Sequence, residues 1–172
     1  PPILTAATGM DAISHCIETF ISPIDNPVAA AIAIDGWERA MRALPRAVSH
    51  PHDLHARREM MIAAMEGALA FQKGLGAVHA LSHPLGGYRD LNLHHGTLNA
   101  ILLPPVLRFN ESVSGETYPR LKRAVGIEPQ ADFAQVMHDF AASLGIPMRL
   151  RDLHVPREIM ADVARLACLD HT

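Results

Sequence analysis

Apolar residues recur at intervals of three or four along most of the chain, which places them on one face of an α-helix. The first such segment begins with the cap-type residues Thr5 and Thr8 and continues through Met10, Ile13 and Ile17. No segment alternates apolar and polar residues as a strand does, and the chain has no internal repeat or low-complexity tract. The pattern therefore predicts an all-α fold with helices over residues 5–20, 28–44, 53–71, 77–85, 97–109, 118–125, 133–144 and 157–169.

Proline and glycine mark the expected ends and bends of these helices. Pro45 is expected to end the second helix, and the pair Gly86-Gly87 to close the fourth. The pair Pro104-Pro105 is expected to kink or turn the fifth helix. Comparing these expected ends and bends with the structure shows how far the local sequence determines where a helix ends.

The chain shows no glycine-rich cradle for a phosphate group. A dinucleotide site needs a strand followed directly by a G-x-G-x-x-G turn and a helix, and neither this pattern nor a P-loop is present. Gly74-Leu75-Gly76 lies between helical segments and lacks the strand. We therefore expect no nucleotide-binding half within residues 1–172.

Composition narrows the class of protein further. Hydrophobic residues make up 49% of 172 residues and charged residues 19%, which suits one folded domain. With a net charge of -3, the chain lacks the positive surface potential that attracts nucleic acid, so nucleic acid is not an expected partner. Charged residues or prolines interrupt the longest apolar stretches, so a membrane is not an expected partner either. Cys16 and Cys168 are far apart and resemble reduced core thiols, and no secretion signal opens the sequence, so we expect a cytoplasmic protein.

Histidine is unusually frequent, with 11 residues, and one Asp–His pair and one His–His pair have members four positions apart. Asp11 and His15 place a carboxylate and an imidazole one turn apart on the first helix, although such a pair more often makes only a side-chain hydrogen bond. His79 and His83 share a face of an otherwise apolar helix. They are either core histidines satisfied by carbonyl groups or members of a site.

A third cluster, His94-His95, lies where a loop leads into the fifth helix, so its alternative role is helix capping. Together the three clusters offer one carboxylate and several imidazoles, a set that suits Fe²⁺ or Zn²⁺ better than Mg²⁺ or Ca²⁺. The remaining histidines are expected to be solvated surface residues: His50, His52, His55, His138, His154 and His171.

Three motifs in order give the chain a specific resemblance. They are TAATGMDAISHCIE at residues 5–18, GLGAVHALSHPLGG at residues 74–87, and His95-Gly96 followed by NAILLP at residues 99–104. This set resembles the C-terminal helical domain of the iron-containing (group III) alcohol dehydrogenases, in the dehydroquinate synthase-like fold. The resemblance covers nearly the whole chain and implies one helical metal-binding domain over residues 1–172.

The resemblance also implies roles for individual residues. His83 would line the substrate pocket and transfer a proton, and Phe71 would lie beside the substrate. The metal ligands implied by the family's motifs are Asp11, His15, His79 and His95. Because unperturbed imidazoles lose their proton near pH 6.5, we expect metal affinity to weaken as the pH falls through that range.

Two departures from the family pattern affect the transfer of these roles. The stretch from His83 to His95 is about two residues longer than the common pattern, and His94 stands where a proline is usual, which leaves His94 open as an alternative ligand to His95. The last helices of the family domain are also expected to be cut short at Thr172. Maleylacetate reductases share the fold but often lack the aspartate ligand, so Asp11 favours the metal-dependent branch.

The activity implied is hydride transfer between a small alcohol or aldehyde and NAD or NADP, with a metal ion polarising the substrate oxygen. The isolated chain is expected to be inactive because the nucleotide domain is missing, and a homo-oligomer remains open. The alternatives are a maleylacetate reductase-like enzyme, a metal-dependent hydrolase and a non-catalytic metal-binding helical bundle. A hydrolase needs a carboxylate base near the metal, and no H-E-x-x-H motif is present.

Overall fold

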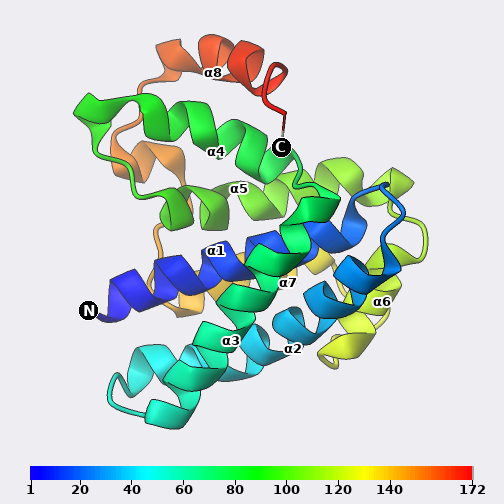
Figure 1. Ribbon diagram of the computed structural model, residues 1–172. Helices are drawn as coiled ribbons and strands as arrows, with labels where there is room; N and C mark the ends of the chain where they lie inside the picture. Colours follow the sequence, from blue (N-terminus) through cyan, green and yellow to red (C-terminus); the bar gives the residue numbers. More distant parts are fainter. Residues whose placement is uncertain (172) are drawn as a thin grey trace.

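The computed structural model describes residues 1–171, and these residues form helices and connecting turns with no strand. This confirms the expected all-α fold. Figure 1 shows α1 crossing the middle of the molecule. The α-helices are α1 (Pro2–Ile21), α2 (Pro27–Ser49), α3 (Leu54–Ala70), α4 (Ala77–Gly87), α5 (His95–Asn110), α6 (Thr117–Ala124), α7 (Phe133–Ser143) and α8 (Met160–Ala167), and the short 3-10 helices are η1 (Phe71–Lys73), η2 (Arg89–Leu91), η3 (Glu111–Val113), η4 (Leu150–Leu153) and η5 (Arg157–Ile159).

The expected end of the second helix at Pro45 is wrong, and tertiary packing explains why the helix continues. α2 continues through Pro45 to Ser49 because Pro45 faces solvent, while Leu44 and Ala47 on the other side are buried in the core. The backbone group that Pro45 leaves unpaired can therefore bond to water. α4 ends at the Gly86-Gly87 pair, as expected, with both glycines as its last residues. α5 is one helix across both of its prolines, so no turn divides it.

α1 is the central helix of the core and packs against α2, α3 and α5 (Figure 1). Its side chains Met10, Ile13 and Ile17 are fully buried, as their spacing predicted. On one side of this centre, α4 lies between α5 and α8. Trp37 of α2 is also fully buried, and its Nε1 donates to the Leu121 carbonyl at 2.9 Å, which joins α2 to α6.

A polar contact joins the end of α1 to the turn that precedes α4. Lys73 in η1 is buried, and its Nζ donates to the carbonyl groups of Thr19 at 2.8 Å and Ser22 at 2.6 Å. These carbonyls belong to the last turn of α1, where a cation satisfies unpaired acceptors. Ser22 Oγ returns a hydrogen bond to the Lys73 carbonyl at 2.8 Å, so the entry into α4 is held in place.

Two glycines let neighbouring helices approach α1 closely. A Cβ at Gly96 in α5 would lie 2.2 Å from the Ala7 carbonyl oxygen of α1, a distance that no side chain tolerates. A Cβ at Gly67 in α3 would lie 3.1 Å from the Cβ of His15. Both approaches flank the part of α1 that carries Asp11 and His15. Among the residues the structure describes, no helix is long and apolar enough to cross a membrane.

Candidate metal centre

Asp11, His15 and Glu18 place three ionisable side chains on one face of α1. Asp11, His15 and Glu18 are spaced four and three residues apart, so their side chains leave the helix on one side. Glu18 is almost completely buried, with a side-chain exposure of 1%, whereas Asp11 is 25% exposed. A carboxylate this deeply buried needs several hydrogen-bond donors.

The first turn of α4 supplies those donors and thereby places His79. Glu18 Oε1 accepts from the Val78 N–H at 2.7 Å, and Oε2 lies 3.3 Å from the backbone nitrogen of His79. Oε2 also lies 2.5 Å from Nδ1 of the His79 ring. Glu18 thus caps the positive end of α4 and leaves Nε2 as the ring nitrogen of His79 that faces Asp11.

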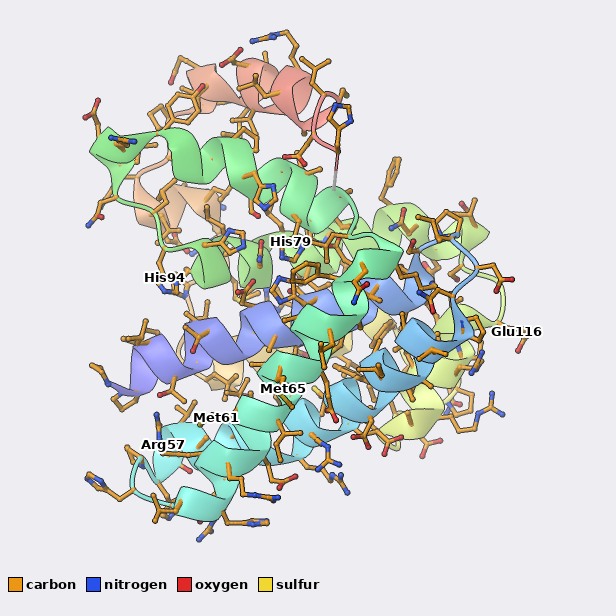
Figure 2. The ribbon with its side chains drawn as sticks, viewed as in Figure 1. Arg57, Met61, Met65, His79, His94 and Glu116 are labelled. Carbon is orange, nitrogen blue, oxygen red and sulfur yellow. The ribbon has the colours of Figure 1, made fainter. Side chains whose placement is uncertain are left out.

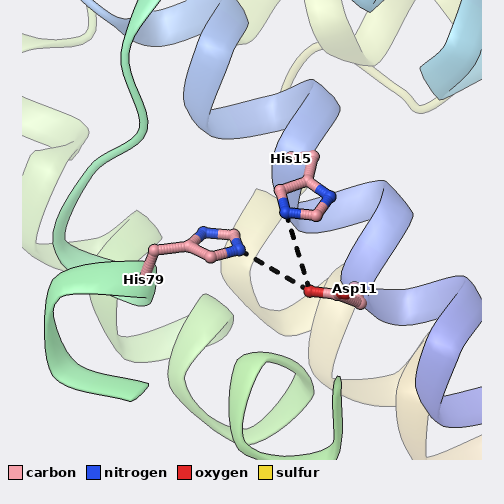
Figure 3. Close-up of side chains that lie close together, drawn as sticks. All are labelled: Asp11, His15 and His79. Atoms are coloured by element: carbon pink, nitrogen blue, oxygen red, sulfur yellow. Dashed lines mark ion pairs between the residues drawn. The ribbon is translucent and has the colours of Figure 1, made fainter. Parts of the chain in front are cut away.

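The side chains of Asp11, His15 and His79 converge on one point (Figure 3). Nε2 of His15 lies 3.9 Å from Asp11 Oδ1, and Nε2 of His79 lies 3.6 Å from the same oxygen. The two imidazole rings are stacked with their centroids 4.6 Å apart. One ligand atom from each of the three residues lies within 4.8 Å of the other two, which is the arrangement of a metal-binding group.

His95 reaches this group from the start of α5. Its Nε2 lies 3.5 Å from Asp11 Oδ1, although its side chain is more exposed than that of His79. Asn99, one turn further along α5, places its amide nitrogen 2.6 Å from Asp11 Oδ1, 3.1 Å from Nε2 of His79 and 3.0 Å from Nε2 of His95. α5 therefore adds a fourth candidate ligand and a buried amide to the cluster.

Burial and charge act differently on the three imidazoles. Burial lowers the pKa of His15 to about 4 against the attraction of Asp11, and burial also lowers the pKa of His95. Burial opposes the charged form of His79 as well, but hydrogen bonds with Asp11 and Glu18 outweigh it and raise the pKa to about 9. The Asp11 pKa is lowered, because its hydrogen bond with His79 and the neighbouring histidines outweigh its burial.

The donor set fits a divalent cation of the Fe²⁺ or Zn²⁺ type. When His79 and His95 are neutral with their protons on Nδ1, three acceptor atoms surround the Asn99 amide nitrogen, which has only two protons to offer. The amide oxygen of Asn99 is buried without a hydrogen-bond partner among the described residues. In that protonation state the cluster holds more lone pairs than protons, and its mixture of imidazole nitrogen and carboxylate oxygen suits these ions.

The other residues singled out from the sequence surround this cluster. The Phe71 ring is partly exposed, with its centroid 5.6 Å from that of His15. The His83 ring is stacked on His95 at 5.6 Å and meets His79 edge-on at 5.8 Å. His94 is exposed before α5, at the edge of the molecule shown in Figure 2, and is not among the residues that contact Asp11. The geometry favours His95 over His94.

Comparison with known proteins decides the family. The model of the Fe-containing alcohol dehydrogenase family, C-terminal, matches residues 5–172. This chain belongs to the iron-containing alcohol dehydrogenase family. The 4-hydroxybutyrate dehydrogenase of Cupriavidus necator is 51% identical over 178 residues, which cover 99% of this chain and 47% of that protein. The chain therefore spans about half the length of the curated relatives it matches, and named members of the family are oxidoreductases.

Solved structures of the family have the same helical fold. A 1,3-propanediol oxidoreductase superposes with a TM-score of 0.93 at 34% identity, over 99% of this chain and 47% of that one. A sulfoacetaldehyde reductase from Bifidobacterium kashiwanohense, solved in complex with NAD+, gives 0.86 at 31% identity over 97% and 44%. A maleylacetate reductase from Rhizobium gives 0.85 at 29% identity over 100% and 48%. The chain thus has the C-terminal helical fold of an iron-containing alcohol dehydrogenase.

Sequence reasoning assigned no role to three residues that the structure brings to the site. Glu18 was detectable because it continues the polar face that begins with Asp11 and His15. Asn99 was detectable because it follows His95 by one helical turn. Asp170 lies 87 residues after His83 in the sequence, and nothing local to either residue indicates that Asp170 Oδ2 lies 2.9 Å from His83 Nδ1.

Proposed function

We propose that this chain is the metal-binding half of an NAD- or NADP-linked alcohol dehydrogenase. The observation that carries the proposal is the convergence of Asp11, His15 and His79 within 4.8 Å, with His95 beside them. These four residues would hold Fe²⁺ or Zn²⁺. When bound, the cation supplies positive charge that polarises the oxygen of an alcohol or aldehyde. The nicotinamide would be held by the part of the protein that corresponds to the other half of its relatives.

The remaining residues of the site would prepare the substrate for hydride transfer. Phe71 places an apolar ring beside His15, where it would shield the reacting carbon from water. As the carbinol carbon gives a hydride to the oxidised nicotinamide, the hydroxyl proton would pass to Nε2 of His83, and the reverse reaction would return it. The exposed ring of His83 can then exchange this proton with solvent.

The identity to a named relative suggests which substrate to test first. Because the relative at 51% identity is a 4-hydroxybutyrate dehydrogenase, we propose a small primary alcohol with 4-hydroxybutyrate as the first candidate. The maleylacetate reductase alternative is less favoured because Asp11 lies at the centre of the imidazole group. A hydrolase is also less favoured, because the buried carboxylate of Glu18 is engaged by α4 and His79 rather than free to act as a base.

An assay of the full-length protein that contains this chain tests the proposed activity. Metal-loaded protein should form NADH or NADPH when supplied with 4-hydroxybutyrate or another small primary alcohol and the oxidised cofactor. Consumption of maleylacetate with no oxidation of alcohols would support the alternative enzyme. Metal binding without any nicotinamide-linked turnover would support a non-catalytic bundle.

The 172-residue chain by itself is expected neither to bind NADH tightly nor to oxidise alcohols. Its described residues contain no strand followed by a glycine-rich turn that could hold a pyrophosphate. Calorimetric titration of the chain with NADH should show no saturable heat. A clear binding isotherm, or turnover of a primary alcohol by this chain alone, would contradict the proposal that the nicotinamide is held by another part of the protein.

Metal affinity is expected to rise with pH up to about pH 9. Burial lowers the pKa of His15 to about 4 and also lowers the pKa of His95, whereas hydrogen bonds with Asp11 and Glu18 raise the pKa of His79 to about 9. Proton and cation therefore compete for Nε2 of His79, and the association constant should rise roughly tenfold per pH unit below that value. Zn²⁺ competition titrations between pH 6 and 9 measure the slope. A Zn²⁺ association constant that stays unchanged above pH 6.5, the pKa of an unperturbed histidine, would contradict competition between proton and cation at His79.

A further inference from the structure

His83 has a charged partner that belongs to a distant part of the chain. Nδ1 of His83 lies 2.9 Å from Oδ2 of Asp170, which lies in the turn after α8. The side chain of Asp170 is 20% exposed and that of His83 is 44% exposed, so the contact is partly sheltered from solvent. The pair links the edge of the imidazole cluster to the last described turn of the chain.

The position of Asp170 is supported by contacts that do not involve His83. α8 packs against α4 through its buried residue Val163 and is seen beside α4 in Figure 1. Tyr88, just after α4, donates its hydroxyl proton to Asp162 Oδ2 at 2.9 Å. The backbone N–H of Asp170 also bonds to the Ala167 carbonyl at 3.3 Å. α8 is therefore fixed on α4 whether or not Asp170 contacts the histidine.

A carboxylate at Nδ1 decides which nitrogen of a neutral imidazole carries the proton. The ionised carboxylate only accepts hydrogen bonds, so Nδ1 must donate and Nε2 must keep the lone pair. The same contact restricts rotation of the His83 ring, which stacks on His95 and meets His79 edge-on. The free lone pair is thus held on a ring that adjoins two of the candidate metal ligands.

We propose that Asp170 is a positioning residue that holds His83 with Nε2 free to accept the substrate proton. This inference rests on the proposed function, in which His83 handles that proton. A surface ion pair that merely anchors the C-terminal segment is the competing interpretation. The packing of α8 and the Tyr88–Asp162 contact already anchor this segment to α4. The contact between Asp170 and His83 is therefore not needed as an anchor, and its distinct effect is on the tautomer and orientation of the His83 ring.

The test compares Asp170→Ala with Asp162→Ala in the full-length protein. Both substitutions remove a carboxylate that links the α8 region to α4, but only Asp170 contacts His83. Asp170→Ala should lower kcat roughly tenfold or more with metal content unchanged, whereas Asp162→Ala should leave kcat within about twofold. In a His83→Ala background, Asp170→Ala should cause no further loss, because the two residues act as one unit.

A spectroscopic readout separates this inference from the proposed activity. In zinc-loaded protein labelled with ¹⁵N-histidine, His83 should carry its proton on Nδ1, and Asp170→Ala should shift it toward the Nε2–H form. A ring already protonated on Nε2 in the parent protein would overturn the inference, as would equal kcat losses in the two carboxylate variants. If the protein oxidises no alcohol at all, the proposed function fails while the tautomer measurement still decides whether Asp170 positions His83.

Discussion

Replacing His83 by alanine is expected to lower kcat roughly 10²- to 10⁴-fold while the protein keeps its metal. The ring lies beside His79 and His95. Its Nδ1 contacts Asp170, however, whereas the three candidate histidine ligands all have Nε2 within 4 Å of Asp11 Oδ1. Its loss should therefore remove proton transfer and leave the cation in place. Steady-state kinetics together with metal analysis of the full-length variant measures both effects.

His138→Ala provides a matched control for this experiment. His138 is a partly exposed histidine on α7 that pairs with its neighbour Asp139, so its removal should change neither kcat nor metal content. Unchanged kcat in the His83 variant would remove His83 from the reaction. Loss of the metal from the same variant would instead make His83 a ligand.

Gly96→Ala is expected to damage both the fold and the metal centre. The new Cβ would lie 2.2 Å from the Ala7 carbonyl oxygen, a backbone atom that can move only if α5 shifts away from α1. Overpacking of this kind costs about 1–3 kcal/mol of unfolding free energy. The shift would also carry His95 away from Asp11, so metal affinity should fall at least about tenfold. Denaturant unfolding and metal titration of the variant measure the two effects.

Gly86→Ala tests whether the result depends on the close helix contact. Gly86 lies within α4, and a Cβ there would meet nothing within 4 Å. Alanine is the better helix former, so this substitution should leave stability unchanged or raise it by up to about 1 kcal/mol. If Gly96→Ala were equally harmless, the close approach of α1 and α5 would not be what places His95.

Most of the helices could be predicted from the sequence because they carry an apolar period and, at several starts, a cap. Asp53 accepts from the Ala56 N–H as the cap of α3, and Asp132 accepts from the Gln135 N–H as the cap of α7. The ends were harder to predict, since burial of Leu44 and Ala47 carries α2 past Pro45. Residues such as proline and glycine indicate where a helix can end, but tertiary packing determines where it does end.

The candidate site was predictable where its residues are neighbours on one helix. Spacing brought Asp11 and His15 to one helix face and His79 and His83 to another, and the resemblance to the family selected Asp11, His15, His79 and His95 as candidate ligands. The contacts between helices did not follow from spacing, because Glu18 and His79 are 61 residues apart and Asn99 and Asp11 are 88 apart. The raised pKa of His79 depends on the two carboxylates that these contacts bring to it.

Metal binding by Asp11, His15, His79 and His95 is the central claim, and elemental analysis during titration tests it most directly. Protein purified without chelator should bind one Fe²⁺ or Zn²⁺ per chain. His79→Ala and His95→Ala should lower the affinity strongly, whereas His138→Ala should match the parent protein. Retention of one tightly bound ion by both the His79 and His95 variants would contradict the account.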